Sequence, residues 1–367
     1  METTGDARIF KPLKFCMFDY LIIGQGLAGS CLAWQLVQRG KKILVLDVPQ
    51  KNRSSMIAAG LFNPITGKLM TRTWLAETLF QSVFDFYPEA ERALNQKFFH
   101  PMPLYRPFLS VQEQNEWMGY SAQPENEKFI ERIHTRSAYG DQAYDAFGGL
   151  VIRQCGYVDV PVFLSSVRVW LVQQNAFAEE WFDESQLQYD NTGVTYKQWQ
   201  ASAVIFCTGV TSQTRLWQAL PVKPLKGETL TVQLDEAPKL IYNRGVYIVP
   251  SAGNYCKVGA TYEAHRLSET ITEKARAELE ARTAELLRLP FQTVAQDWGM
   301  RPTSPDRRPM LGRHPNSKNV VIFNGLGTKG VSLAPYFAAH LADWLAGVAE
   351  IMPVVNINRF KALYSKS

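Results

Sequence analysis

Six residues near the start of the chain have the spacing of a phosphate-binding turn. They are Gly24-Gln25-Gly26-Leu27-Ala28-Gly29, a G-x-G-x-x-G pattern. Glycine at these places permits a tight turn, close approach of the backbone to a diphosphate, and close packing of a helix on a strand. The N–H groups and the dipole at the start of the following helix attract the phosphates. The pattern predicts a dinucleotide site in which Gly24, Gly26, Leu27, Ala28 and Gly29 contact the cofactor.

The neighbouring residues predict the strand–helix–strand unit that such a turn requires. Residues 18–23 (FDYLII) are a short apolar run, residues 27–39 have helical spacing, and residues 42–48 (KILVLDV) are typical of a second buried strand. Asp47 ends that strand 23 positions after Gly24, where a carboxylate can accept hydrogen bonds from the cofactor's ribose. A glycine turn that binds nothing would leave Asp47 unexplained. FAD and NAD share this arrangement, so it does not choose between them.

Further along, segments with helical spacing alternate with short β-rich runs. We expect helices at residues 74–86, 89–96, 161–175, 272–289 and 330–345, and strands at residues 203–206, 228–234, 245–249, 255–262 and 320–323. The pattern predicts an α/β fold, in which a Rossmann-like nucleotide-binding domain that is discontinuous in sequence carries an inserted β-rich α+β substrate domain. The expected nucleotide-binding segments are 17–85, 150–220 and 295–367, the substrate domain comprises 86–149 and 221–294, and 1–16 form a tail.

The composition narrows the class of protein. The 367 residues are 46% hydrophobic, and 39 basic and 34 acidic residues give a net charge of +5. This modest excess suits an anionic substrate or cofactor and does not indicate nucleic acid. No run approaches the ~18 apolar residues of a membrane span. The five cysteines form no C-x-x-C pair and the five histidines are scattered, so we expect no metal site and a reducing cytoplasm as the compartment.

Five later segments resemble, in order, motifs of the D-amino-acid oxidase superfamily of FAD-dependent oxidoreductases, and of glycine oxidase and sarcosine oxidase in particular. The segments are 54–61 (SSMIAAGL), 222–228 (VKPLKGE), 247–250 (YIVP) with 258–261 (VGAT), 298–303 (WGMRPT) and 325–331 (GLGTKGV). With the glycine pattern they cover nearly the whole chain. The resemblance implies that the cofactor is FAD and that the nucleotide-binding domain is an FAD-binding domain.

The resemblance also implies which residues lie beside FAD. The first segment lies beside the flavin, the residues after the central strand pass along the cofactor, and the loop before the last helix presents N–H groups to the pyrimidine edge. Reduced flavin gains negative charge at that edge, and a helix N-terminus stabilises it. Lys329 either adds its positive charge to that of the helix N-terminus or is a solvated lysine. The three groups are Ser54, Ser55, Ala58, Ala59, Gly60 and Leu61; Thr208 and Gly209; and Gly327, Thr328, Lys329, Gly330 and Val331.

Four residues are implied to act on the substrate or on oxygen. Arg301, also beside the cofactor, is implied to bind the substrate carboxylate, because a guanidinium matches a carboxylate bidentately; its alternative is an ion pair with Asp306. Tyr242 and Tyr247 stand five positions apart, like a pair lining the glycine oxidase pocket, or are ordinary strand aromatics. Lys257 matches a lysine over the flavin of sarcosine oxidase and is a candidate for activating oxygen, or it lies on the solvent face of a strand.

The reaction that the resemblance implies is FAD-dependent oxidation of an amino acid or secondary amine that bears a carboxylate. A hydride passes from the α-carbon to the flavin, the imine is hydrolysed, and oxygen reoxidises the flavin to give hydrogen peroxide. Non-covalent FAD is expected, because no cysteine lies at residues 299–301, which correspond to the covalent attachment segment of sarcosine oxidases. The stretch 63–108, with Lys68, Arg72 and Arg106, matches these oxidases poorly, so an anionic substrate wider than glycine stays open.

Other functions stay open at this point. Residues 325–330 also resemble the oxidase half of a bifunctional tRNA wobble-uridine enzyme, which oxidises a glycine-like side chain of modified tRNA, although the modest charge disfavours nucleic acid. A flavin dehydrogenase would pass its electrons to an acceptor other than oxygen. A non-catalytic flavin-binding protein is disfavoured by the presence of Arg301, and a nicotinamide dehydrogenase by the flavin segments. A homo-oligomer is also open.

Overall fold

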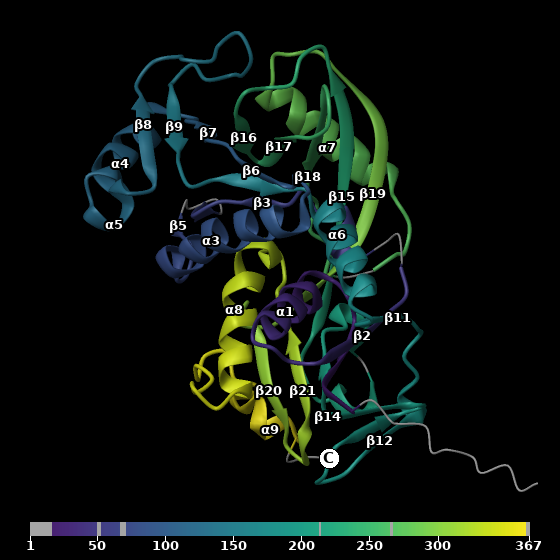
Figure 1. The fold of residues 1–367 in the computed structure, drawn as a ribbon. Helices are drawn as coiled ribbons and strands as arrows, with labels where there is room; N and C mark the ends of the chain where they lie inside the picture. The colour runs from purple at the N-terminus through teal and green to yellow at the C-terminus, as the bar shows by residue number, and fades with distance from the viewer. Residues whose placement is uncertain (1–16, 50–52, 67–70, 213, 265–266, 365–367) are drawn as a thin grey trace, which may run out of the picture.

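The computed structural model describes residues 17–49, 53–66, 71–212, 214–264 and 267–364. The expected tail at residues 1–16 and the side chain of Lys68 lie outside this range. The chain forms two bodies, each built on its own large sheet, with the nucleotide-binding motif in one and most of the β-rich inserts in the other (Figure 1). Within the described ranges, no helix has both the length and the apolar character needed to cross a bilayer.

The first body is built on a mostly parallel sheet. Its eight strands in the described chain are, in order, β11 (Phe177–Glu179), β2 (Ile43–Asp47), β1 (Met17–Ile23), β14 (Trp199–Phe206), β13 (Val194–Tyr196) and β12 (Leu187–Tyr189), with β21 (Ser317–Asn324) beside β14 and β20 (Met310–His314) beside β21. Every residue of β2 is buried, as expected for a parallel strand covered on both faces. The predicted Rossmann-like domain is confirmed.

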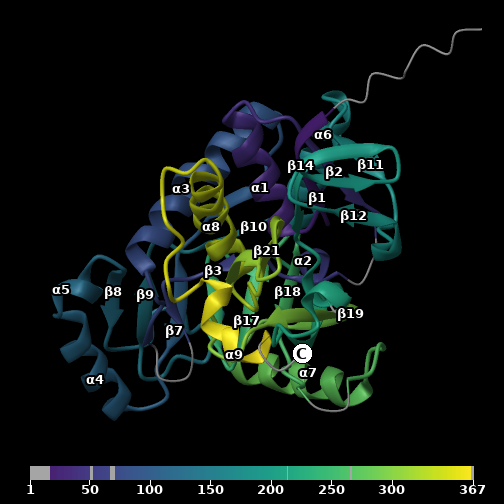
Figure 2. The same cartoon turned by 90° about the horizontal axis from the view of Figure 1, so that it is seen from below.

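Four helices share one apolar core with this sheet. They are α1 (Leu27–Gln38), α3 (Ala76–Leu94), α6 (Val160–Gln173) and α8 (Gly330–Leu345). α8 packs between α1 and α3, and α1 also contacts α6 (Figure 2). These contacts bring together elements that are up to 300 residues apart in the sequence, because residues 330–345 return to the first βα unit of the chain.

The second body is a mostly antiparallel sheet with one helix on its outer face. The described chain contributes eight strands in the order β19 (Phe291–Thr303), β15 (Lys223–Leu234), β18 (Tyr255–Gly259), β17 (Val246–Pro250), β16 (Ile241–Arg244), β7 (Leu104–Pro107), β9 (Gly149–Ile152) and β8 (Ile130–His134). α7 (Glu273–Leu286) buries Leu279 and Leu286 against Leu230, Val232 and Ile248. The opposite face of the sheet is therefore left to form the site.

The remaining elements lie outside the two large sheets. They are α2 (Ser54–Ile57), β3 (Leu61–Phe62), β4 (Ile65–Thr66), β5 (Thr71–Arg72), β6 (Phe99–Pro101), α4 (Val111–Ser121), α5 (Pro124–Glu127), β10 (Gly156–Val158), η1 (Glu184–Gln186), η2 (Gly209–Ser212), η3 (Arg215–Trp217), η4 (Ile357–Phe360) and α9 (Lys361–Tyr364). Strands β9 and β19 cross the expected domain boundaries at residues 150 and 295. Helix α3 also spans the expected boundary between residues 85 and 86, and the division into two domains stays a prediction.

The two helices expected at residues 74–86 and 89–96 are a single helix, α3, with Pro88 inside it. The expectation was wrong because proline lacks the N–H of a helical hydrogen bond, and we took it as a break. The buried face continues across it, through Phe86, Tyr87 and Ala90. The hydroxyl of Tyr87 also donates to the carbonyl oxygen of Val331 at the start of α8, at 3.0 Å. Packing of this face and the hydrogen bond from Tyr87 offset the helical hydrogen bond that Pro88 cannot donate.

A buried ion pair lies on β15, the strand that runs through the second sheet toward the first body. Lys226 and Glu228 are 2% and 3% exposed, and Lys226 Nζ lies 2.9 Å from Glu228 Oε1. Glu228 also accepts hydrogen bonds from the Thr272 backbone N–H and from Gln296. Burial raises the pKa of Glu228, but these hydrogen bonds, with that from Lys226, outweigh it and hold the pKa below its ordinary value.

We predict that Glu228→Gln lowers the free energy of unfolding by about 3–5 kcal/mol, because it leaves the ammonium of Lys226 buried without its partner. Urea unfolding followed by circular dichroism measures this. Replacing both residues by methionine should recover most of the loss, and Glu131→Gln, at an exposed position of β8, is the control. An unfolding midpoint for Glu228→Gln equal to that of the control would contradict the prediction.

Candidate cofactor and substrate cleft

The glycine pattern forms the tight turn expected between β1 and α1. Gly24 has a φ of +98°, and a Cβ there would lie 2.7 Å from the carbonyl oxygen of Cys207. A Cβ on Gly29 would overlap the carbonyl oxygen of Gly24. Both positions therefore require glycine, and the start of α1 sits directly against the carboxyl ends of β1 and β14.

Two helix N-termini meet at this point. α1 begins after Gly26 and α8 after Lys329, and neither has a side-chain cap or an acidic residue in its first turn. A Cβ on Gly330 would lie 3.0 Å from Leu27 Cδ1, so the two starts are in contact. The Leu27 N–H donates to Ser55 Oγ at 3.4 Å, but within the described chain the N–H groups of Ala28, Gly330 and Val331 are available to an anionic ligand, and both helix dipoles favour one.

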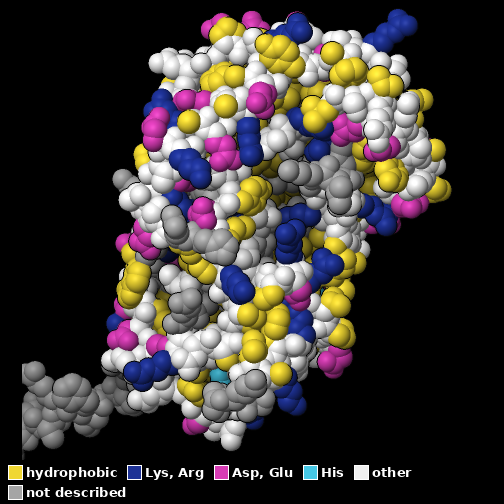
Figure 3. All heavy atoms as spheres, turned by 180° about the vertical axis from the view of Figure 1, so that it is seen from behind, with side chains coloured by type: hydrophobic (Ala, Val, Ile, Leu, Met, Phe, Trp, Pro, Cys, Tyr) yellow, Lys and Arg dark blue, Asp and Glu magenta, His cyan; other side chains and the backbone are white. Residues whose placement is uncertain are grey.

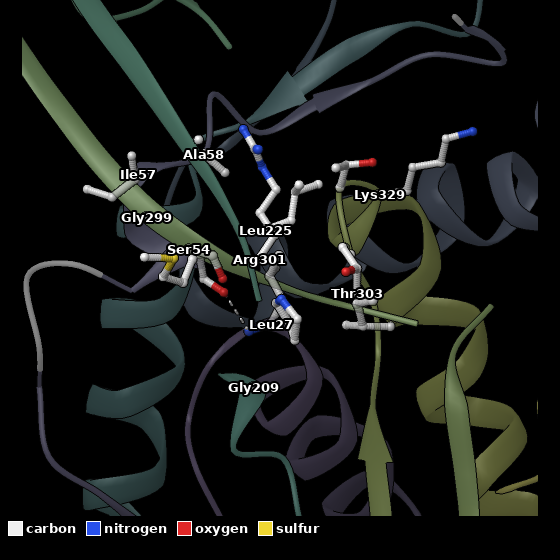
Figure 4. Close-up of a pocket in the computed structure, with 18 of the residues that line it drawn as sticks. Leu27, Ser54, Ile57, Ala58, Gly209, Leu225, Gly299, Arg301, Thr303 and Lys329 are labelled. Carbon is white, nitrogen blue, oxygen red and sulfur yellow. Dashed lines mark hydrogen bonds between the residues drawn. The ribbon is translucent and has the colours of Figure 1, made fainter. Parts of the chain in front are cut away.

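A cleft of about 1940 Å³ runs between the two bodies (Figure 4). It reaches from the end of β2 past both helix starts to the inner face of the second sheet. Most of the cofactor residues expected from the sequence line it: Gly24, Gly26, Leu27, Ala28, Asp47, Ser54, Ser55, Ala58, Ala59, Gly60, Leu61, Thr208, Gly209, Arg301, Gly327, Thr328, Lys329, Gly330 and Val331. Gly29 does not line it, and acts through its packing against Gly24.

Asp47 lies at the end of the cleft next to β2 and is buried. Its Oδ2 is 2.6 Å from Arg53 Nη1 and 3.5 Å from Arg168 Nη2. Within the described chain, Oδ1 has no hydrogen-bond partner. The carboxylate is therefore held in place through one oxygen, and the other is available to a ribose hydroxyl. No motif in the sequence marks Arg53 or Arg168 as partners of Asp47.

Arg301 lies on the inner face of the second sheet, between the α2 residues on one side and Thr303 and Lys329 on the other (Figure 4). Its guanidinium group lies over Gly227, where any Cβ would collide with it. Nη1 donates to the carbonyl oxygen of Thr261 at 3.3 Å, and the guanidinium stacks 5.0 Å from the ring centre of Tyr262. The alternative partner, Asp306, is instead paired with Arg359 at 2.7 Å.

The structure separates the two tyrosines that the sequence grouped together. Tyr247 lines the cleft and packs on Gly259. Burial raises its pKa to about 12, despite a lowering effect of Arg301, so its hydroxyl stays protonated at neutral pH. Tyr242 is fully buried on the α7 side and donates to Gln142 Oε1 at 2.9 Å. In the β16–β17 ladder Tyr247 is opposite Asn243, not Tyr242, so the two rings point to opposite faces.

Lys257 does not line the cleft either. It lies on the same face of β18 as Gly259 but one step further along the strand, where it is partly exposed. Its Nζ is 2.9 Å from Asp297 Oδ2. The expectation that this lysine lies over the flavin is therefore not supported, because its side chain forms an ion pair on the sheet outside the cleft.

Lys329 extends away from Arg301 and into the wall of the cleft (Figure 4). Its Nζ donates to Thr66 Oγ1 and Thr73 Oγ1, each at 3.1 Å. Burial, with the nearby charges of Arg308 and Arg307, lowers its pKa to about 8. Lys329 is thus a partly buried cation next to the start of α8, and its ammonium is hydrogen-bonded to two threonines.

Several basic residues that line the cleft were not assigned to it from the sequence, among them Arg106, Arg244, Arg282, Arg307 and Arg308. On the face shown in Figure 3, Lys and Arg side chains surround a recess near the middle of the molecule. The buried Thr229 was missed as well, and nothing in its sequence context marks it. Arg106 had a detectable signal, since it is a charged residue inside an apolar run (PLYRPFL).

Comparison with known proteins identifies the cofactor. The family model described as FAD dependent oxidoreductase matches residues 19–344. This chain belongs to the FAD-dependent oxidoreductase family. The glycine oxidase of Pseudomonas aeruginosa is 25% identical over 363 residues, covering 90% of this chain and 96% of that protein. The chain is therefore an FAD-dependent oxidoreductase similar to glycine oxidase.

Solved structures of this family support the fold. The crystal structure of glycine oxidase from Geobacillus kaustophilus superposes with a TM-score of 0.77 at 19% identity, covering 94% of this chain and 98% of that one. The crystal structure of iminodiacetate oxidase from Chelativorans has a TM-score of 0.75 at 18% identity, covering 93% and 98%. At these identities the likeness concerns the fold alone.

The residues of the cleft fit FAD, the cofactor of this family. The glycine turn leaves room for a diphosphate where two helix N-termini point, and the carboxylate of Asp47 has an oxygen available at the ribose end. Bound FAD would supply the two-electron chemistry. The turn at Gly24 and the start of α1 would hold the diphosphate, and the positive helix end of α8 would favour negative charge on the cofactor.

We predict that FAD is bound without a covalent link. The four described cysteines, Cys31, Cys155, Cys207 and Cys256, are buried. Burial raises the pKa of each thiol, that of Cys256 to about 12, so none is the thiolate that attachment requires. Acid precipitation of the purified yellow protein should leave all of the flavin in the supernatant. Yellow colour that stays in the washed pellet would refute this.

Proposed function

We propose that this protein oxidises an amine that bears a carboxylate, with Arg301 as the carboxylate-binding residue. The observation that carries the proposal is a guanidinium on the inner wall of an FAD cleft that has no acidic partner in the described chain. Such a group is matched in charge and shape to a carboxylate, which it binds through two parallel hydrogen bonds. The similarity to glycine oxidases supports the same substrate class.

The neighbouring side chains would orient such a substrate. The hydroxyl of Tyr247, which stays protonated at neutral pH, can donate to the carboxylate or accept from the amine. The α8 N-terminus and Lys329 would supply positive charge that favours the cofactor when it gains electrons. FAD would accept the hydride from the α-carbon, water would hydrolyse the imine, and oxygen would take up the electrons to give hydrogen peroxide. Positioning a neutral amine with its Cα–H toward the flavin is the protein's main contribution.

The direct test is a panel of amino acids and N-substituted amino acids, mixed anaerobically with the FAD-loaded protein. We expect at least one amine to bleach the flavin absorbance. The matching acids without an amine should leave the absorbance unchanged. Admitting air should restore the colour and release hydrogen peroxide. Recovery only with a quinone would favour a dehydrogenase, and bleaching only by modified tRNA would favour the RNA-modifying reaction. Bleaching by dithionite but by no amine would refute the proposal.

Replacing Arg301 should separate substrate binding from cofactor binding. We predict that Arg301→Ala retains FAD but loses about 2–4 kcal/mol in kcat/KM, because a charge-assisted bidentate contact is removed. Arg301→Lys should recover only part of the lost kcat/KM, because lysine keeps the positive charge but lacks the planar guanidinium that binds a carboxylate bidentately. Steady-state kinetics and flavin-monitored titration with small carboxylates measure this. Unchanged carboxylate binding in Arg301→Ala would show that the residue is structural.

A second variant tests the geometry without removing the charge. A methyl group at Gly227 would collide with the flexible end of Arg301 and displace it, whereas Gly119→Ala, on α4 in open space, changes nothing near the cleft. We predict that Gly227→Ala folds and holds FAD but weakens small carboxylates by about tenfold or more. Equal affinities in the Gly227→Ala and Gly119→Ala proteins would contradict the assigned position of the guanidinium.

A further inference from the structure

Arg106, on β7, is a buried cation of the cleft, and no described residue pairs with its charge. The residue is 8% exposed, and its Nε is buried without an acceptor. No hydrogen bond or ion pair joins its side chain to another described residue, and it lines the cleft. Arginines this buried are normally paired, because moving an unpaired charge away from water is strongly unfavourable.

The neighbouring charges do not neutralise it. Glu113 attracts Arg106 electrostatically, but its two oxygens accept from Arg244 Nη1 at 2.7 Å and from the Leu109 N–H at 2.8 Å. Arg244 brings another positive charge close to Arg106. Burial and this charge lower the pKa of Arg106 to about 10, so it is still a cation at neutral pH. Within the described chain, no group neutralises the positive charge of Arg106.

Strand register places Arg106 on the inner face of the second sheet. Tyr105 and Tyr242 pair across β7 and β16, and both rings pack on the α7 side. Because side chains alternate along a strand, the next residues, Arg106 and Asn243, face the cleft. Both line it. Arg106 thus faces the same space as the substrate groups.

A polar row crosses this face from Arg106 toward Arg301. Asn243 is opposite Tyr247, Tyr247 is opposite Gly259, and Gly259 is opposite Thr229. The hydroxyl of Thr229 is also buried without a partner. Four strand spacings, about 19 Å, separate β7 from β15, over which the Arg301 guanidinium lies. The two arginines therefore stand at opposite ends of one row, with neutral polar groups between them.

We propose that Arg106 binds a second anionic group, so that the amine oxidised by this protein is anionic at both ends. This rests on the proposed function, in which Arg301 holds the carboxylate next to the reacting carbon. A monocarboxylic amino acid would leave the charge of Arg106 unpaired in the cleft. An amine with a distal carboxylate or phosphate would neutralise it, and a guanidinium binds either group bidentately.

Flavin-monitored titrations of the FAD-loaded protein test this with inert probes. Each dicarboxylate (succinate, adipate, suberate, sebacate) is compared with the monocarboxylate of equal length (butyrate, hexanoate, octanoate, decanoate), so that the series covers both short and long separations of the two arginines. We expect the best dicarboxylate to bind the wild type about tenfold or more tighter than its partner, and Arg106→Met to abolish this advantage while monocarboxylate affinity is unchanged. Arg132→Met, at an exposed position of β8 in the same sheet, should keep the advantage.

A further variant and a further probe separate the possible outcomes. Arg106→Lys should keep part of the advantage, and it carries the test if the methionine variant does not fold. If 3-phosphonopropionate binds tighter than succinate, the distal group is a phosphate or phosphonate. A dicarboxylate advantage that is absent from the wild type, or that survives in Arg106→Met, overturns this inference and leaves the proposed function intact. If no carboxylate perturbs the flavin and no amine bleaches it, the proposed function itself fails.

Discussion

The cleft depends on two glycines that face each other across the longest strands of the second sheet. Gly227 of β15 and Gly299 of β19 are in register, so the sheet carries no side chain at this point. The guanidinium of Arg301 lies over the first, and a Cβ on the second would be 3.3 Å from Ser54 Cα in α2. Larger residues would expel the guanidinium or push α2 away. The cofactor-binding body and the substrate-binding sheet can therefore approach each other because the sheet is bare here.

The same approach concentrates positive charge. The starts of α1 and α8, Arg301, Lys329 and Arg106 all border the cleft, and among the described residues none of the three side chains has an acidic partner. Holding such groups together away from water opposes folding. An anionic cofactor and an anionic substrate remove that penalty, so each stabilises the folded protein when it binds. The positive charge of the cleft thus favours ligands that are negatively charged.

The cofactor half of the site could be predicted from the sequence because its determinants are local. The turn at Gly24, the helix after it and Asp47 all lie within one βα unit, and family motifs supplied the rest. The substrate half depends on which strands pair and in what register, which no short motif encodes. Tyr242 and Tyr247 are close in sequence, yet the hairpin between them sends their rings to opposite faces. Lys257 was left with two alternatives for a similar reason, because its position along β18 decides whether it reaches the cleft.

This division bears on how substrate choice can differ within one fold. The flavin chemistry needs only the cofactor half and a carboxylate anchor beside the reacting carbon, and both resemble glycine oxidase. The far end of the polar row is β7, which belongs to the stretch that matches those oxidases least. Under the proposed function, a residue such as Arg106 on that strand would face the distal part of the substrate, away from the carboxylate held by Arg301. A change on β7 can therefore alter which amine is accepted while leaving hydride transfer to the flavin as it is.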